Sequence, residues 1–329
     1  ISDLASIQEG QPSPFTRHGP SVKSAIKPDL VAYGGNYAVN ARSEQQWKFR
    51  LRGLGVLSLT HNFIGNKLFC EDSGTSFSAP YVGHLAGKLL NRYPDLSANT
   101  LRCLLANHAE IPQALKDTFS ENIRNDYKSI YNSDIIHDIS GYGQVNEDNL
   151  YSSSQDAVTI IAESKIPNDK NQFYHLPLPK NFFESPKRTR TITVSLAYTP
   201  YVRSTRLEYV ATRIKFRLVE GDNLQEIVDS FDNDKKDDHK SISEYRPSNH
   251  EIGSAIRDKC TLQSSTWKLK RFKDIPKLYV VVTRQDNPWG EDFASELENY
   301  SLVITITDRE NQQANLYSQM RQILNARGQ

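Results

Sequence analysis

The chain has 329 residues, 37% of them hydrophobic, and its 40 Lys and Arg nearly cancel its 39 Asp and Glu. This length suffices for about two domains with real cores, and a formal net charge of +1 gives no general attraction to nucleic acid or anionic lipid. We therefore expect no nucleic-acid partner. We also expect no membrane span, because no apolar run approaches the roughly 18 residues that a span needs.

Residues 1–155 alternate short strand-like runs with helices, a pattern typical of an α/β domain. The strands expected are residues 30–32 and 56–60, and the helices are residues 75–92 and 98–107. Ser97 follows Pro94 and is the expected N-cap of the second helix. Residues 121–138 are polar, and we expect them to cover the surface.

Ser76 lies at the start of the first expected helix, in the segment Asp-Ser-Gly-Thr-Ser-Phe-Ser-Ala-Pro at residues 72–80. Gly74 and Thr75 let the backbone turn sharply and leave little bulk beside the serine hydroxyl. The unpaired N–H groups and the dipole at a helix start favour a developing oxyanion. Ser76 is therefore the candidate nucleophile, with simple helix capping as the alternative role.

Four segments of the chain resemble motifs of the subtilases, the subtilisin-like serine peptidases. They are Ser-Pro-Phe-Thr-Arg-His-Gly-Pro at residues 13–20, Lys-Pro-Asp-Leu-Val-Ala-Tyr-Gly at 27–34, the serine segment at 72–80, and Gly-Tyr-Gly-Gln-Val-Asn at 141–146. The family patterns are Ser-Phe-Ser-x-x-Gly-Pro, Lys-Pro-Asp-x-x-Ala-Pro-Gly, Gly-Thr-Ser followed by small residues and Pro, and Gly-x-Gly-x-Val-Asn. The resemblance implies an α/β fold with a subtilisin-like parallel sheet, which here is incomplete.

Two catalytic groups of that family have no counterpart in this sequence. A subtilase orders its triad Asp, His, Ser, and the first two lie well upstream of the serine. Asp72 abuts the serine and belongs to its motif, whereas His18 belongs to a Gly-Pro turn. The oxyanion-hole asparagine of the family also precedes the segment at 13–20. We therefore expect Ile1 to enter the catalytic domain near its final third, with an N-terminal catalytic segment missing.

The resemblance implies a serine endopeptidase that hydrolyses peptide bonds of a polypeptide substrate through an acyl-serine intermediate. Ser76 would be the nucleophile, and Ser73, Gly74 and Thr75 would form part of the specificity-pocket wall and the oxyanion environment. Serine needs an oriented imidazole to remove its proton, so this chain alone is expected to be inactive. The alternative is a noncatalytic protein-binding module derived from a degenerate protease.

The eight histidines give no cofactor or metal site. His84 lies two helical turns after Ser76, about 12 Å along the helix axis, which is beyond hydrogen-bond reach. No cluster of His, Cys or carboxylate residues has the spacing of metal ligands. We expect no cofactor; a structural calcium ion, common among subtilases, cannot be placed from these residues.

The three cysteines, Cys70, Cys103 and Cys260, are odd in number and widely spaced. A disulfide framework is not expected from them, and this usage fits a reducing compartment better than an oxidising one. We therefore expect a cytoplasmic protein, although a signal peptide would precede the missing segment.

From residue 156 to 329 strand patterns dominate and predict an all-β domain, a sandwich or jelly roll. The strands expected are residues 158–162, 173–178, 191–197, 209–219, 266–272, 278–283 and 302–307. A charged insertion at about 221–257 begins with a short amphipathic helix, and a C-terminal helix at 313–327 is expected to dock on the sandwich or on another chain.

Several subtilases carry such a β-sandwich behind the catalytic domain. Two aromatic loops, at residues 198–201 and 286–290, form either a ligand-facing rim or ordinary turns with packed rings. The sandwich is the expected place for a protein partner.

Overall fold

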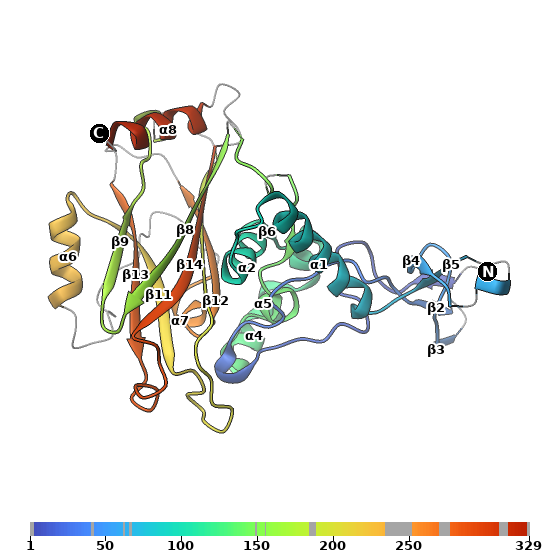
Figure 1. Cartoon of the computed structure of the whole chain (residues 1–329). Helices are drawn as coiled ribbons and strands as arrows, with labels where there is room; N and C mark the ends of the chain where they lie inside the picture. Colours follow the sequence, from blue (N-terminus) through green and yellow to red (C-terminus); the bar gives the residue numbers. More distant parts are fainter. Residues whose placement is uncertain are drawn as a thin grey trace. The chain divides into compact units, whose positions relative to one another are not determined.

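The structure, a computed structural model, describes residues 3–40, 43–61, 63–65, 68–148, 150–154, 156–183, 189–233, 252–269, 277–308 and 315–327. The chain forms two compact units (Figure 1). The first contains Ile1–Asp95 and Ala109–Asn146, and the second contains Leu96–His108 and Glu147–Gln329. Both units mix helices and strands, which is compatible with an α/β fold for the first.

The first unit contains short strands and a set of helices. Its strands are β1 (Asp3–Ala5), β2 (Ala38–Asn40), β3 (Ser43–Lys48), β4 (Val56–Leu59), β5 (Phe69–Asp72), β6 (Ala109–Glu110) and β7 (Gln144–Val145). Its helices are α1 (Thr75–Arg92), α3 (Gln113–Thr118), α4 (Glu121–Tyr131) and α5 (Ile135–Ser140), with single 3-10 turns η1 (Val22–Ser24) and η2 (Phe63–Gly65). The helix predicted over residues 75–92 is confirmed as α1.

The sheets of the first unit are small and antiparallel among the residues described. They are β1-β2-β3, the β4-β5 hairpin and the β6-β7 pair. The run at residues 30–32 contributes one parallel bridge, Val31 to Gln144. The run at 56–60 forms β4, which pairs with β5, the next strand along the chain, and not with residues 30–32. A multi-stranded parallel sheet stays a prediction.

The second unit is built on long antiparallel strands. These are β8 (Ala157–Pro167), β9 (Asn171–His175), β10 (Arg190–Tyr198), β11 (Thr212–Glu220), β12 (Leu262–Leu269), β13 (Leu278–Asp286) and β14 (Leu297–Thr307). The helices are α2 (Ala98–Asn107), α6 (Leu224–Asn233), α7 (Ser254–Arg257) and α8 (Leu316–Arg327), with the 3-10 turn η3 (Lys180–Phe182). Each of the seven predicted strands corresponds to one of these.

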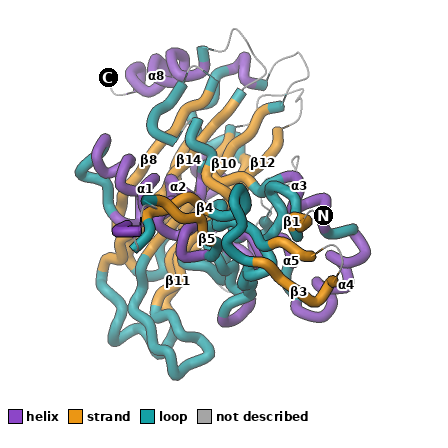
Figure 2. The backbone as a smooth tube through the Cα atoms, turned by 90° about the vertical axis from the view of Figure 1, so that its right-hand side faces the viewer, coloured by secondary structure: helices purple, strands orange, loops and turns teal. Residues whose placement is uncertain are grey.

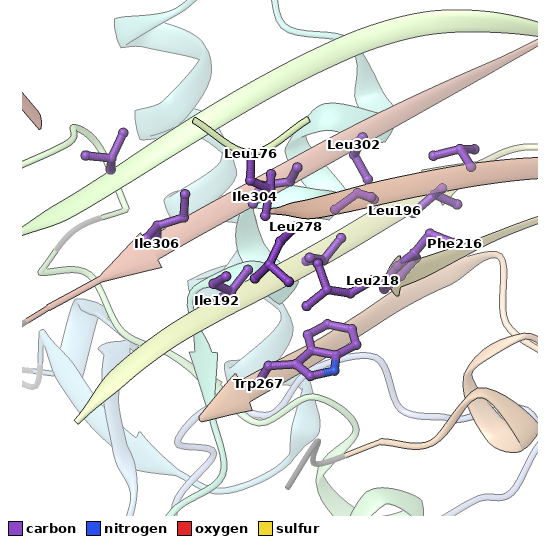
Figure 3. Close-up of a cluster of buried hydrophobic side chains, with 14 of the residues drawn as sticks. Leu176, Ile192, Leu196, Phe216, Leu218, Trp267, Leu278, Leu302, Ile304 and Ile306 are labelled. Carbon is purple, nitrogen blue, oxygen red and sulfur yellow. The ribbon is translucent and has the colours of Figure 1, made fainter. Parts of the chain in front are cut away.

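The seven strands form two sheets, β12-β10-β14-β8 and β11-β13-β9, and Figure 2 shows the first sheet side by side in that order. The longest register runs from Ala157 opposite Thr307 to Pro167 opposite Leu297. Side chains of both sheets share one buried cluster, in which Trp267 of β12 lies against Phe216 of β11 with ring centroids 6.2 Å apart (Figure 3). This cluster is the main core of the unit.

Helix α2 belongs to the second unit, although it lies in the predicted α/β range 1–155. Ser97 accepts a hydrogen bond from the backbone N–H of Thr100, which confirms the predicted N-cap. The helix packs on β10, β12 and β14. Its buried face mixes apolar and polar side chains. Asn107 Nδ2 donates to the Ser195 hydroxyl over 3.0 Å and to the Val303 carbonyl over 3.2 Å. Hydroxyl-rich strands therefore hold α2 by hydrogen bonds as well as by apolar contact.

Two helices complete the second unit. The predicted amphipathic helix at the start of the insertion is α6, whose Ile227 and Phe231 pack with Val281 on the sheet of β13. The predicted C-terminal helix is α8, whose Leu316 and Met320 are buried in the main core. The charged part of the insertion, residues 234–251, lies outside the described residues. No helix in the described part of the chain is long and apolar enough to cross a membrane.

Candidate active site

Ser76 is the second residue of α1 and its side chain is exposed. Among the described residues, its hydroxyl has no hydrogen-bond partner. The N-terminal N–H groups of a helix have no intrahelical acceptors and carry the positive end of the helix dipole. The hydroxyl therefore lies beside donors that stabilise an oxyanion, in a position open to a base and a substrate.

The turn before Ser76 is held by a neighbouring segment, residues 34–36. The Gly74 N–H donates to the Gly34 carbonyl over 2.7 Å, and the Ser73 hydroxyl donates to the Asn36 carbonyl over 3.0 Å. These bonds use both residues in positioning, so the wall predicted at residues 73–75 has a fixed backbone.

Two glycines make this close approach feasible. A Cβ on Gly34 would lie 2.6 Å from Ser78 Oγ and 2.8 Å from the Gly74 carbonyl oxygen. Gly35 has φ +85°, a conformation that L side chains rarely adopt, and a Cβ there would lie 2.4 Å from Ser73 Oγ. We name residues 34–36 the strap, since this segment lies against the serine turn and its two glycines leave room for the Ser73 and Ser78 side chains.

The strap is itself anchored from the N-terminal part of the unit. The Ser13 hydroxyl donates to the Gly35 carbonyl over 2.7 Å, and the Ser6 hydroxyl donates to Asn36 Oδ1 over 2.6 Å. Asn36 Nδ2 donates in turn to the Ile7 carbonyl over 3.1 Å. Sequence reasoning did not identify Asn36, Ser6 or Ser13 as positioning residues. The available signal was the Gly-Gly-Asn sequence at residues 34–36, which begins at the last residue of the motif at 27–34.

Asp72, the carboxylate nearest in sequence, is used in holding the turn. Its Oδ1 accepts from the Ser73 N–H over 2.9 Å, and its Oδ2 lies 3.0 Å from Arg50 Nε. The carboxylate is thus oriented toward the backbone before the helix and a guanidinium. This agrees with its assignment to the serine motif and leaves it no role as the family's triad aspartate.

No histidine in the described part of the chain forms a hydrogen bond with the Ser76 hydroxyl. His84 is exposed on α1, the His18 ring lies 2.6 Å from the Gly19 carbonyl, and the buried His137 ring lies 3.0 Å from the Gly141 carbonyl. Since Ser76 Oγ has no hydrogen-bond partner in the described part of the chain, none of these rings acts as its base there.

Metal and thiol chemistry find little support near Ser76. The described residues contain no group of three metal-ligating side chains, so a calcium position stays unassigned. The three cysteines are free. Cys70 in β5 is exposed, whereas burial raises the pKa of the Cys103 thiol well above its ordinary range. Cys103 is therefore a packing residue of α2, and its Sγ lies 3.3 Å from the Ser301 carbonyl of β14.

Among the described residues, one side of α1 and the β4-β5 hairpin are exposed. A Cβ on Gly83 or Gly87 would meet no atom within 4 Å, although Leu85 and Leu89 on the same helix are fully buried. In the β4-β5 hairpin, Leu59 and Phe69 are 68% and 55% exposed. Small residues on a helix permit close packing of another backbone, and exposed apolar groups of this size mark contact surfaces.

Comparison with known proteins agrees with this geometry. A sequence model of the subtilase family matches residues 4–151, which contain Ser76 and the strap. An uncharacterized protein of Sinorhizobium fredii, y4bN, is 32% identical over 325 residues; the match covers 96% of this chain and 71% of that protein.

Proposed function

Because this chain belongs to the subtilase family, we propose that it is the nucleophile-bearing part of a subtilisin-type serine endopeptidase. Ser76 attacks the scissile carbonyl of a polypeptide substrate and forms an acyl-serine. The observation that carries the proposal is the exposed hydroxyl of Ser76 at the start of α1, free of hydrogen bonds among the described residues. A nucleophile needs that exposure, because a base and a substrate must both reach the hydroxyl.

The serine turn, held by the strap, provides an oxyanion donor and a wall of the specificity pocket. The Ser76 N–H is one oxyanion donor, and the backbone at Ser73, Gly74 and Thr75 forms a wall of the specificity pocket. The two bonds from the turn to the strap fix these groups before substrate arrives. Preorganised donors of this kind stabilise an oxyanion without reorganisation during the reaction.

The general base, its carboxylate and the oxyanion asparagine come from a polypeptide segment outside these 329 residues. Support comes from the bare face of α1 at Gly83 and Gly87 and from the exposed hairpin. Such a segment would complete a parallel sheet and cover these surfaces. Without it, the serine lacks a base, and loss of triad partners costs several powers of ten in rate. The chain alone is therefore inactive in this proposal.

The second unit is, in the same proposal, a β-sandwich domain that recognises a protein partner. Its two antiparallel sheets contribute to one buried cluster, the pattern of facing sheets. The alternative function is a noncatalytic binding module derived from a protease. The intact serine turn favours the peptidase, since binding alone has no need of an exposed reactive hydroxyl.

The test is hydrolysis of denatured casein by the chain joined to a segment that carries the Asp and His. We expect Ser76→Ala to reduce the rate by several powers of ten. Ser78→Ala, two residues along the same helix, is the matched control and should retain most of the activity. Casein hydrolysis that survives Ser76→Ala would exclude Ser76 as the nucleophile.

A further inference from the structure

A cavity of about 400 Å³ lies in the first unit, and the strap forms part of its wall. Ile7, Val31, Leu54 and Leu115 give it an apolar lining, and Ser13 and Gln144 add polar groups. This volume lies within the usual range of small-ligand sites, about 300–1,000 Å³. The peptidase chemistry proposed for Ser76 makes no use of it, since none of residues 73–76 lines the cavity.

The charge of the lining indicates the kind of ligand. Among the described residues that line the cavity, Glu9 alone is charged. Glu9 Oε1 accepts a hydrogen bond from the Tyr33 hydroxyl over 3.2 Å. Within the described part of the chain, Oε2 has no partner and no cationic side chain pairs with the carboxylate. The cavity therefore presents one unused anionic acceptor beside apolar walls.

We propose that this cavity binds an organic cation: an ammonium or guanidinium group on a short apolar stem, as in a lysine or arginine side chain. The cation pairs with Glu9 while the stem covers Ile7, Val31 and Leu54. An anionic ligand would meet the Glu9 carboxylate with no compensating charge in the lining. A neutral ligand of the same shape would gain no ion pair with the exposed carboxylate of Glu9.

The strap connects the cavity to the serine turn, so a ligand in the cavity affects that turn. Gly34, Gly35 and Asn36 line the cavity, and the carbonyls of Gly34 and Asn36 accept the bonds from Gly74 and Ser73. A ligand that contacts the strap therefore changes the surroundings of the Gly74 N–H. This amide is a reporter of binding that needs no peptidase activity.

The test uses the full 329-residue chain and two amino-acid probes with blocked termini. N-acetyl-lysinamide carries a cationic side chain, and N-acetyl-norleucinamide is its neutral analogue. Binding is measured by ¹H–¹⁵N NMR titration, with the amides of Gly34, Gly35 and Gly74 as reporters. We expect the lysine probe to bind about five-fold more tightly, the preference that one partly exposed ion pair supplies. Glu9→Gln should remove this preference, and Asp126→Asn, an exposed carboxylate on α4, should leave it intact.

A neutral analogue that binds as tightly as the lysine probe would overturn the proposal. So would an unchanged preference in Glu9→Gln, or an absence of shifts in the strap amides. A second arm distinguishes the source of the cation by comparing n-pentylamine with an acetylated and amidated Ala-Lys-Ala peptide. Tighter binding of the peptide assigns the site to a polypeptide side chain, and tighter binding of the amine assigns it to a free small cation. Because neither readout depends on hydrolysis, failure here leaves the role of Ser76 unaffected.

Discussion

Ser73 and Ser76 lie three residues apart and differ in how their hydroxyls are used. The Ser73 hydroxyl donates to the Asn36 carbonyl and fixes the turn, whereas the Ser76 hydroxyl has no partner among the described residues. Removal of an unpartnered, exposed hydroxyl leaves no buried polar group unsatisfied. The two serines therefore have different sensitivities to substitution.

We expect Ser76→Ala to change the free energy of unfolding by less than about 0.5 kcal/mol, because surface substitutions without contacts rarely do more. Ser73→Ala should cost about 1 kcal/mol, since it removes one hydrogen bond to the strap. Urea unfolding of the two variants measures the difference. A larger loss for Ser76→Ala would mean that its hydroxyl has a structural partner.

The glycines near the site also divide into two kinds. Gly34→Ala places a methyl group 2.6 Å from Ser78 Oγ, so we expect a destabilisation of about 1–3 kcal/mol. Gly83→Ala meets nothing within 4 Å and should stabilise α1 by about 0.5–1 kcal/mol in the isolated chain. Chemical denaturation of both variants checks the contrast. Equal effects would contradict the packing described for the strap.

At the scale of elements, the start of α2 is held by hydrogen bonds to a carboxylate of β8. The Glu163 carboxylate accepts from the Ser97 N–H over 3.1 Å and from the Thr100 hydroxyl. The bond from Thr100 outweighs desolvation and, with those from Ser97, holds the pKa of Glu163 below its ordinary value. A carboxylate in this position also complements the positive end of the helix dipole.

The sign of this shift predicts a pH dependence. A carboxyl whose pKa falls on folding stabilises above its unfolded-state pKa, about 4.3 for Glu, and this contribution disappears as the pH falls through the folded-state value. Glu163→Gln should therefore be less stable than the wild type at pH 7, and the gap should narrow as the pH falls from 7 to 3. Urea unfolding across this range tests it, with Glu296→Gln, an exposed carboxylate, as control. A constant gap between Glu163→Gln and the wild type at both pH values would contradict the capping role.

Helix α8 depends on apolar burial instead. Met320 is 1% exposed within the main core of the second unit, so Met320→Ala should cost about 2–5 kcal/mol. Gln322→Ala, on an exposed position of the same helix, should be nearly neutral. The midpoint of chemical denaturation gives both values, and a neutral Met320→Ala would mean that α8 does not dock on the core in solution.

Elements with strong local patterns could be predicted from the sequence. The alternation in residues 191–197 predicted β10, and Ser97 before an apolar run predicted α2. The polar segment at residues 121–138 was expected to cover the surface. It contains α4, which has no buried residues, and the first part of α5, in which Ile136, His137 and Asp138 are buried. Its signals were the caps Ser120 and Asp134, whose side chains accept from backbone N–H groups of those helices.

Other features had no local signal. The sequence pattern shows that α2 has an apolar face, but the sheet that covers that face is set by tertiary packing, so α2 was grouped with the wrong neighbours. At the site, Ser76 was predicted to be the nucleophile from its motif, and this role stays a prediction. The anchoring of Asn36 by Ser6 joins residues 30 apart in sequence, and such pairs depend on three-dimensional register.

At the scale of the whole molecule, the two units differ in how completely they are packed. Among the described residues, the second unit holds a buried cluster of 23 residues, whereas in the first unit a Cβ on Gly83 or Gly87 of α1 would meet nothing within 4 Å. Local stability follows the density of buried contacts. The unit that contains Ser76 is therefore expected to be the less stable one.

Hydrogen exchange tests that difference. Amides of α1 should exchange faster than those of β10 and β14 in the isolated chain, and addition of the segment that carries the Asp and His should slow the exchange of α1. The exchange of β10 and β14 serves as the internal control. If α1 were already as protected as β10, its open face would be covered without any added segment.

The most direct test of the central claim is labelling of the chain by a fluorophosphonate, which reacts with activated serines. We predict no labelling of the chain alone, and labelling at Ser76 once the Asp and His segment is supplied, with loss of the label in Ser76→Ala and its retention in Ser78→Ala. Absence of labelling in a complex shown to be folded would contradict the peptidase and favour the noncatalytic binding module.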